Sequence, residues 1–129
     1  MKFEPKQPPR IFEVGNSVRF AMRDCGNLAL DADEQVTLTT PSGGELDVAR
    51  KSWGFYVTPS LNARLSGFGL RAVLIRNRST ARYFVLAVEA GQEADFDAYL
   101  VQENCVVVAW LDTSEALERL RTAMETATP

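Results

Sequence analysis

The segment 70–89 reads LRAVLIRNRSTARYFVLAVE and holds two apolar runs on either side of a polar turn. Residues 70–76 and 82–89 have the length and apolar content of strands, and residues 77–80 have the composition of a turn. Strands joined by so short a connection pair as an antiparallel hairpin. We therefore expect a β hairpin at the centre of the fold, and we assign the other segments around it.

Three elements are expected after this hairpin. In residues 92–104 the apolar side chains recur at spacings of three and four, which predicts an amphipathic helix. Residues 105–111, CVVVAWL, are uniformly apolar, as is typical of a central strand. Asp112 and Glu115 then resemble a capping pair for a final helix. The apolar face of that helix would consist of Ala116, Leu117, Leu120 and Met124.

The segment before the hairpin would complete the order of strands and helices known from a common fold. Pro59 stands where the first turn of a helix tolerates proline, so we expect a short helix from there to about Ser66. If residues 53–57 form a strand, residues 53–111 have the order βαββαβ of a ferredoxin-like sandwich with its helices on one face. A more barrelled or mixed sheet, continued by strands from the N-terminal part, is the alternative.

The N-terminal third favours antiparallel β structure. Residues 11–14 and 17–23 flank Gly15-Asn16, which is a tight-turn signal, and residues 35–40 and 45–49 flank a second turn. Residues 1–10 carry three prolines and no periodic pattern, so they predict an extended N-terminal arm outside the core. The expected organisation is this arm followed by a single α+β domain, residues 11–129. In that domain the N-terminal hairpins precede the ferredoxin-like sandwich and a C-terminal helix.

The composition is that of a globular domain. Of the 129 residues, 46% are hydrophobic and 24% are charged, which argues against a disordered tail, a fibre or a coiled coil. Fourteen basic and seventeen acidic side chains leave a net charge of −3, which argues against a nucleic-acid partner. The longest apolar run has seven residues, so we expect neither an export signal nor a membrane contact.

The cysteines and the lack of histidine bear on chemistry and compartment. Cys25 and Cys105 lie far apart without CxxC spacing, and no histidine is present to act as a metal ligand or base. We expect two buried, reduced thiols and a cytoplasmic protein, with no metal and no cofactor. The acidic run 31–34 is interpreted as a solvated loop rather than a metal site.

Charge is strongly segregated along the chain. Residues 48–88 carry seven basic and no acidic side chains, whereas residues 89–129 carry two basic and nine acidic ones. Six of the seven cations in this basic block, residues 48–88, are arginines, which bind phosphate and carboxylate in a bidentate manner. The block could pair internally with residues 89–103, or it could bind an anion.

Residues 50–64 combine cations, aromatic rings and small polar groups around the expected helix start. A helix N-terminus presents free N–H groups and partial positive charge to an anion. Two of the aromatic residues could stack on a base or a sugar ring. The candidate ligand-binding residues are Arg50, Lys51, Trp53, Tyr56, Thr58, Ser60, Asn62 and Arg64.

The run 51–62, KSWGFYVTPSLN, is followed by the strands of 70–77 and 82–89, by YLVQE at 99–103 and by VVVAWL at 106–111. Together these segments resemble a small uncharacterised bacterial protein family encoded among enzymes of cell-surface polysaccharide biosynthesis. The resemblance spans about residues 10–112 and implies no catalytic residue. It shifts the expected ligand toward sugars and nucleotide-sugars.

These observations favour a non-catalytic binding or accessory module for an anionic small molecule, such as a nucleotide-sugar or an acidic sugar. One alternative is a small sugar- or nucleotide-modifying enzyme, which would have to take its acid or base from carboxylates, Tyr56 or Lys51. Another is an interaction protein whose basic block pairs internally. An uncovered hairpin edge further predicts a homodimer.

Overall fold

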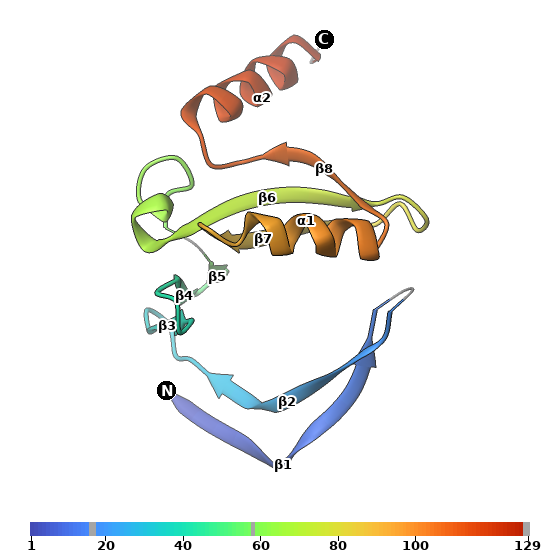
Figure 1. Ribbon diagram of the computed structural model, residues 1–129. Helices are drawn as coiled ribbons and strands as arrows, with labels where there is room; N and C mark the ends of the chain where they lie inside the picture. The colour runs from blue at the N-terminus through green and yellow to red at the C-terminus, as the bar shows by residue number, and fades with distance from the viewer. Residues whose placement is uncertain (16–17, 58, 128–129) are drawn as a thin grey trace.

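The computed structural model describes residues 1–15, 18–57 and 59–127 and shows an α+β chain (Figure 1). The expected α+β class, with antiparallel sheets and a C-terminal helix, is confirmed. The elements are β1 (Lys2–Val14), β2 (Phe20–Ala29), β3 (Gln35–Thr39), β4 (Glu45–Lys51), β5 (Gly54–Tyr56), the 3₁₀ helix η1 (Leu65–Phe68), β6 (Leu70–Asn77), β7 (Tyr83–Glu89), α1 (Glu93–Gln102), β8 (Cys105–Trp110) and α2 (Ser114–Ala127).

The main sheet has the order β7-β6-β8, and both pairings are antiparallel. Val73 and Ile75 of β6 pack with Phe96 and Leu100 of α1 on one face of this sheet. Successive strand residues point to opposite faces, so Leu70 and Ala72 belong to the other face, where they pack with Leu65. The predicted hairpin and the predicted helix α1 are thus confirmed, and β6 rather than β8 is the central strand.

The ferredoxin-like topology is not confirmed. β5 pairs with β4 in a separate sheet of order β3-β4-β5 and does not join β6. The helix expected from Pro59 is also wrong, because residues 61–64 form turns and only η1 follows them. The carbonyl of Ser60 accepts the backbone N–H groups of Arg64 and Leu65, which closes the chain into this turn. Serine, asparagine and glycine have low helix propensity, and several of them occupy this short segment.

The N-terminal strands form a long two-stranded ribbon. Val14 is paired with Phe20, which agrees with the predicted hairpin, although Asn16 of the expected turn lies outside the described residues. β1 begins at Lys2, so the expected arm 1–10 is extended but forms part of this strand. The register shifts between Pro5 and Arg10, where the ribbon bends (Figure 1).

Asp24 on β2 stabilises this bend of the ribbon by ion pairs with β1. Its carboxylate accepts hydrogen bonds from Lys6 Nζ at 2.6 Å and from Arg10 at 3.3 Å. These bonds, led by the one from Lys6, lower the pKa of Asp24. Ion pairs between β1 and β2 therefore stabilise the bend, while most side chains of the ribbon are exposed.

The cysteines differ from the expectation in part. Both thiols are free, as expected, but Cys25 is exposed and Cys105 is only half-buried. Cys25 lies on β2, and the two-stranded ribbon leaves both faces of that strand largely in solvent. Burial of its sulfur, with the nearby Glu103 as a second cause, raises the pKa of Cys105.

The solvent-accessible surface of the chain is larger than that of a compact monomer of the same mass. Its solvent-accessible area is 9142 Å², whereas a compact monomer of 14.3 kDa exposes about 6800 Å². The excess includes many large apolar side chains, among them Phe3, Phe20, Phe55, Val85 and Met124. Neither helix of the described residues has the length and apolarity to span a bilayer.

Arg71 fixes the connection between β8 and α2. Its Nε lies 2.7 Å from Asp112 Oδ2, and its guanidinium stacks 4.0 Å from the ring centroid of Trp110. Asp112 therefore binds Arg71 rather than capping α2, and Thr113 caps the helix by accepting the Ala116 N–H at 3.1 Å. Asn62 Nδ2 donates to Ser114 Oγ at 3.1 Å and holds the first residue of α2.

Replacing Arg71 with methionine tests this arrangement. The Asp112 carboxylate is only 10% exposed, so losing its charged partner should lower the free energy of unfolding by about 1.5–3 kcal/mol. Arg78→Met changes an exposed arginine and should stay within about 0.5 kcal/mol of wild type. Urea denaturation followed by circular dichroism measures both variants. Equal effects of the two would contradict a structural role for Arg71.

Candidate binding surface

An exposed aromatic segment follows the turn between β4 and β5. Lys51 pairs directly with Gly54, so Ser52 and Trp53 form the turn, and Gly54 has a φ of 144° that suits glycine. In the turn and just beyond it, large apolar side chains stand in solvent instead of entering a core. Their exposed fractions are 70% for Trp53, 59% for Phe55, 50% for Tyr56 and 55% for Val57.

A groove of about 470 Å³ adjoins this segment. It runs between the two three-stranded sheets, on the face of β6 opposite α1, and we call it the inter-sheet groove. Apolar side chains from three strands, β4, β6 and β7, and from loops supply its lining. They are Leu46, Val57, Leu61, Ala72, Val85, Leu86, Ala87 and Leu111. A surface of this composition suits apolar side chains of a partner better than a charged ligand.

The β3–β4 turn is hydrogen-bonded to the end of β7, close to the groove residue Leu46 of β4. Ser42 Oγ donates a hydrogen bond to Glu89 Oε2, and Thr40 Oγ1 accepts the Gly44 N–H at 2.9 Å. A Cβ at Gly44 would lie 2.9 Å from Glu89 Cγ, so a larger residue there would require the Glu89 side chain to move. Hydrogen bonds from the Ser42 and Thr40 hydroxyls lower the pKa of Glu89.

The cations proposed for the anion site have partners within the chain. Arg50 Nη1 donates to the Leu30 carbonyl at 2.7 Å, and Lys51 Nζ lies 2.6 Å from Asp33 Oδ1. Arg64 lies over the Phe68 ring, 5.5 Å from its centroid. The bond from Lys51 also lowers the pKa of Asp33. The cations nevertheless keep exposed surface, and Arg50 is directly opposite Phe55 in the β4–β5 pairing.

The small polar residues proposed for the same site serve the local turn. Ser60 Oγ accepts the Arg64 N–H at 3.0 Å, and Asn62 binds Ser114. Thr58 lies outside the described residues. Since η1 has only four residues and starts at Leu65, the expected helix N-terminus that would have gathered these groups is wrong. Trp53 and Tyr56 are exposed, as a stacking role requires.

The rest of the basic block is partly paired. Arg71 binds Asp112 and lies 3.9 Å from Glu93, which belongs to the acidic segment expected as its partner. Arg76 lies 5.9 Å from the Tyr83 ring centroid. Internal contacts therefore account for much of the block, although they reach Asp33 and Asp112 as well as residues 89–103.

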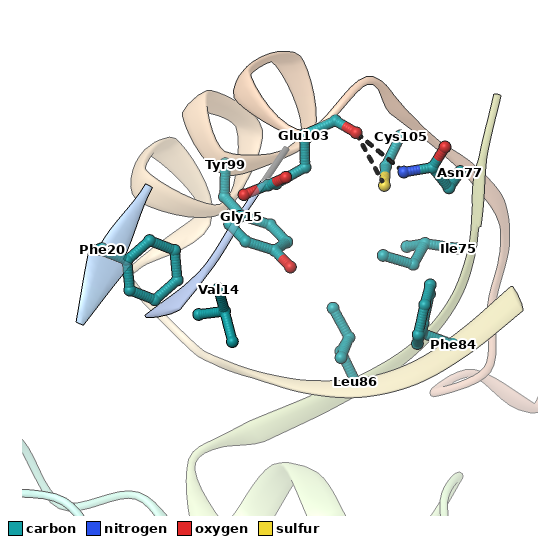
Figure 2. Close-up of a pocket in the computed structure, with 10 residues that line it drawn as sticks. All are labelled: Val14, Gly15, Phe20, Ile75, Asn77, Phe84, Leu86, Tyr99, Glu103 and Cys105. Atoms are coloured by element: carbon teal, nitrogen blue, oxygen red, sulfur yellow. Dashed lines mark hydrogen bonds between the residues drawn. The ribbon is translucent and has the colours of Figure 1, made fainter. Parts of the chain in front are cut away.

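A second cavity, of about 200 Å³, separates the tip of the ribbon from the main sheet (Figure 2). Figure 2 shows Val14 and Phe20 on the ribbon side, the Tyr99 hydroxyl directed into the space, and Glu103 beside Gly15. Asn77, which is 5% exposed, donates to the Glu103 carbonyl at 3.1 Å and accepts two backbone N–H groups of its own turn.

The polar groups of this cavity lack the character of a reactive site. The Cys105 thiol donates to the Glu103 carbonyl at 3.6 Å, and its raised pKa keeps it protonated. Burial also raises the pKa of Tyr99. Within the described parts of the chain, His, Cys, Asp and Glu side chains do not gather in groups of three or more that could hold a metal ion.

Comparison with protein-family models, with curated proteins and with solved structures finds no match for this chain.

Sequence reasoning missed the groove-lining residues Leu61, Val85 and Ala87. The alternation of β7 carried a signal, because Val85 and Ala87 point away from the α1 face on which Leu86 and Val88 pack. The signal did not show which surface they would face, since that depends on where the β3-β4-β5 sheet lies.

The hydrogen bond from Ser42 to Glu89 should make stability depend on pH. A carboxylate with a lowered folded pKa stabilises the fold above its ordinary value of 4.5, and this contribution is lost as the pH falls through the folded value. Ser42→Ala should therefore lower the melting temperature at neutral pH, and the difference from wild type should shrink below about pH 4.5. Thermal denaturation from neutral pH to about pH 3 measures this difference.

Ser66→Ala is the control, since Ser66 is an exposed serine on η1. Its difference from wild type should not vary with pH. A Ser42→Ala difference that stays constant down to pH 3 would contradict the role given to Glu89.

Proposed function

We propose that this protein is a non-catalytic binding module. Its working surface is the exposed segment 53–57 together with the inter-sheet groove. The observation that carries this proposal is the exposure of Trp53, Phe55, Tyr56 and Val57 beside an unfilled apolar groove. Large exposed apolar patches on a folded chain are typical of sites that contact another macromolecule.

The chemistry of the chain supports binding rather than catalysis. The groove lining is apolar, so it offers no acid or base to a bound substrate. Lys51, one of the expected acid or base candidates, is bound by Asp33. The Cys105 thiol in the other cavity is kept protonated by its raised pKa. An enzyme would need a titratable group aimed at a substrate, and the groove holds none among its described lining residues.

An anionic sugar or nucleotide-sugar is the second candidate ligand. Arg50 lies opposite Phe55 in the β4–β5 pairing, next to exposed Trp53 and Tyr56, so a cation and stacking rings occupy one edge. The stretch 48–88, which has no acidic residue, also favours an anionic ligand. The resemblance to a bacterial protein family encoded among enzymes of polysaccharide biosynthesis favours a sugar or nucleotide-sugar. In this version the protein is an accessory module that holds the ligand without changing it.

A photo-crosslinking residue at position 55 tests the proposed surface. Replacing Phe55 with p-benzoylphenylalanine keeps an aromatic side chain at a solvent-exposed position, so folding should be unaffected. Irradiation of cells that produce this variant should give discrete protein adducts of the chain. The same residue at Arg78, which is exposed on the β6–β7 turn, is the matched control and should give few adducts.

Equal adducts from both positions, or none from position 55, would contradict the proposed surface.

The proposal of an anionic sugar ligand is tested by calorimetric titration of UDP-glucuronate into wild type, Arg50→Ala and Arg78→Ala. Binding that weakens about tenfold or more in Arg50→Ala alone would favour the sugar ligand. Equal binding by all three proteins would argue against it.

A further inference from the structure

We propose that this chain forms a two-fold dimer in which strand β7 pairs antiparallel with β7 of a second copy. The main sheets of the two copies then form one continuous sheet. The juxtaposition is of an edge strand with outward backbone groups and opposite charges at its two ends. This inference goes beyond the proposed function, because it concerns a sheet edge and does not require that the inter-sheet groove bind anything.

Half of the backbone groups of β7 point out of the main sheet. The Asn77 N–H donates to the Arg82 carbonyl at 2.8 Å, and the Ala90 N–H donates to the Gly69 carbonyl at 2.9 Å. Residues of an antiparallel strand alternate between bonding to the neighbouring strand and facing away from it. Because the β6–β7 register is continuous, the even-numbered residues of β7 bond to β6. The N–H and C=O groups that face outward belong to Tyr83, Val85, Ala87 and Glu89.

These outward groups match the backbone of another strand. β7 stands at the end of the order β7-β6-β8, so no strand among the described residues lies on its outer side. Edge groups of this kind bind an extended chain, which supplies donors and acceptors at the same spacing. Tyr83 is 58% exposed and Val85 is 67% exposed, so the approach to this edge is open.

The other long outer strands have features that oppose edge pairing, and β7 does not. Proline, charged side chains and a neighbouring helix are among the features that keep edge strands apart. β1 has three prolines, and β2 has Arg23, Asp24 and Gly26. Helix α2 lies beside β8, and residues of both line a cavity of about 430 Å³. β7 reads YFVLAVE, without proline, glycine or lysine, and its single charge is at the end.

The charges at the two ends of β7 indicate a second copy of this chain as the partner. The first end is basic, with Arg82 just before the strand and Arg76 of β6 opposite Tyr83. The last end is acidic, with Glu89 in the strand and Asp95 exposed in the first turn of α1. An antiparallel pair of identical strands places the basic end of each beside the acidic end of the other. Opposite charges therefore favour this pairing and oppose a parallel one.

The alternation of β7 also fits two-fold symmetry. A two-fold axis perpendicular to the sheet pairs odd-numbered residues with odd-numbered ones, and all the outward groups belong to odd-numbered residues. The axis that uses the whole strand passes through Leu86, at its middle. Val85 of one copy is then opposite Ala87 of the other. Because the axis joins two identical edges, no β7 edge remains to add a third copy.

This dimer places the two inter-sheet grooves on one surface. Val85 and Ala87 line the groove, on the face of the main sheet opposite α1. An axis perpendicular to the sheet leaves both α1 helices on one face and both grooves on the other. Each dimer therefore offers two equal grooves side by side, and a partner that fills both binds more tightly than one that fills a single groove.

Sedimentation analysis of variants at position 85 tests the backbone pairing. The Val85 N–H faces away from β6, so Val85→Pro removes a hydrogen bond of the dimer and leaves the β6–β7 pairing intact. This variant should raise the dimer dissociation constant at least about tenfold. Val85→Thr keeps the N–H and a branched side chain, and it should stay within about threefold of wild type. Circular dichroism checks that both variants fold.

Two lysine variants compare the two edges of the main sheet. Val85→Lys brings two cations together near the axis and should raise the dissociation constant at least about tenfold. Val108→Lys makes the same change at an exposed position of β8 and should stay within about threefold of wild type. Equal effects of the two variants, or an effect of Val108→Lys alone, would overturn β7 as the interface.

Hydrogen exchange measured for single amides locates the contact independently. The Val85 and Ala87 amides should become protected as the protein concentration rises through the range of dimer formation. The Phe84 and Leu86 amides bond to β6 and should be protected at every concentration. A dimer in which the Val85 and Ala87 amides exchange as fast as in the monomer would contradict the pairing.

The outcomes separate this inference from the proposed function. A chain that stays monomeric at high concentration would overturn the dimer. The binding surface would then still be judged by the adducts from position 55, because Phe55 lies on β5, in the other three-stranded sheet. A dimer that depends on β7, without adducts from position 55, would support this inference and contradict the binding surface.

Discussion

Strand β6 supplies side chains to two separate apolar clusters, which place α1, η1 and β4 around it. Val73 and Ile75 hold α1 on one face, and Leu70 and Ala72 hold η1 and the β4 side chain Leu46 on the other. Each cluster has few fully buried members. Because one strand serves both, the β3-β4-β5 sheet is held near the main sheet without covering it. The inter-sheet groove is the space that this arrangement leaves.

The sequence predicted the local pairings well, because local pairings depend on neighbouring residues. The hairpins β1–β2, β3–β4 and β6–β7 follow from alternation and turn composition, and α1 follows from the spacing of Phe96 and Leu100. The strand order was beyond such reasoning. The apolar run 105–111 looked central, yet β8 lies at an edge, because a run of this kind does not reveal which neighbour will pair with it.

The candidate site failed where it depended on a helix. Nothing in residues 59–66 outweighed their low propensity, so Ser60 closed a turn and the anion-binding end did not form. Trp53 and Tyr56 are exposed, as stacking on a ligand requires, and their role stays a prediction. The neighbouring Val57 lines the groove together with Val85, which comes from a strand about thirty residues later. Only the tertiary structure brings these two segments together.

The β1–β2 ribbon has a consequence for local stability. Its two strands pair on either side of the bend and are joined by the ion pair of Lys6 with Asp24, but most of its side chains remain in solvent. Breaking a region with little buried apolar surface costs far less free energy than unfolding the whole chain. Its amides should therefore exchange with solvent while those of β6 stay protected. The ribbon is the part of this molecule that can change conformation while both clusters around β6 remain intact.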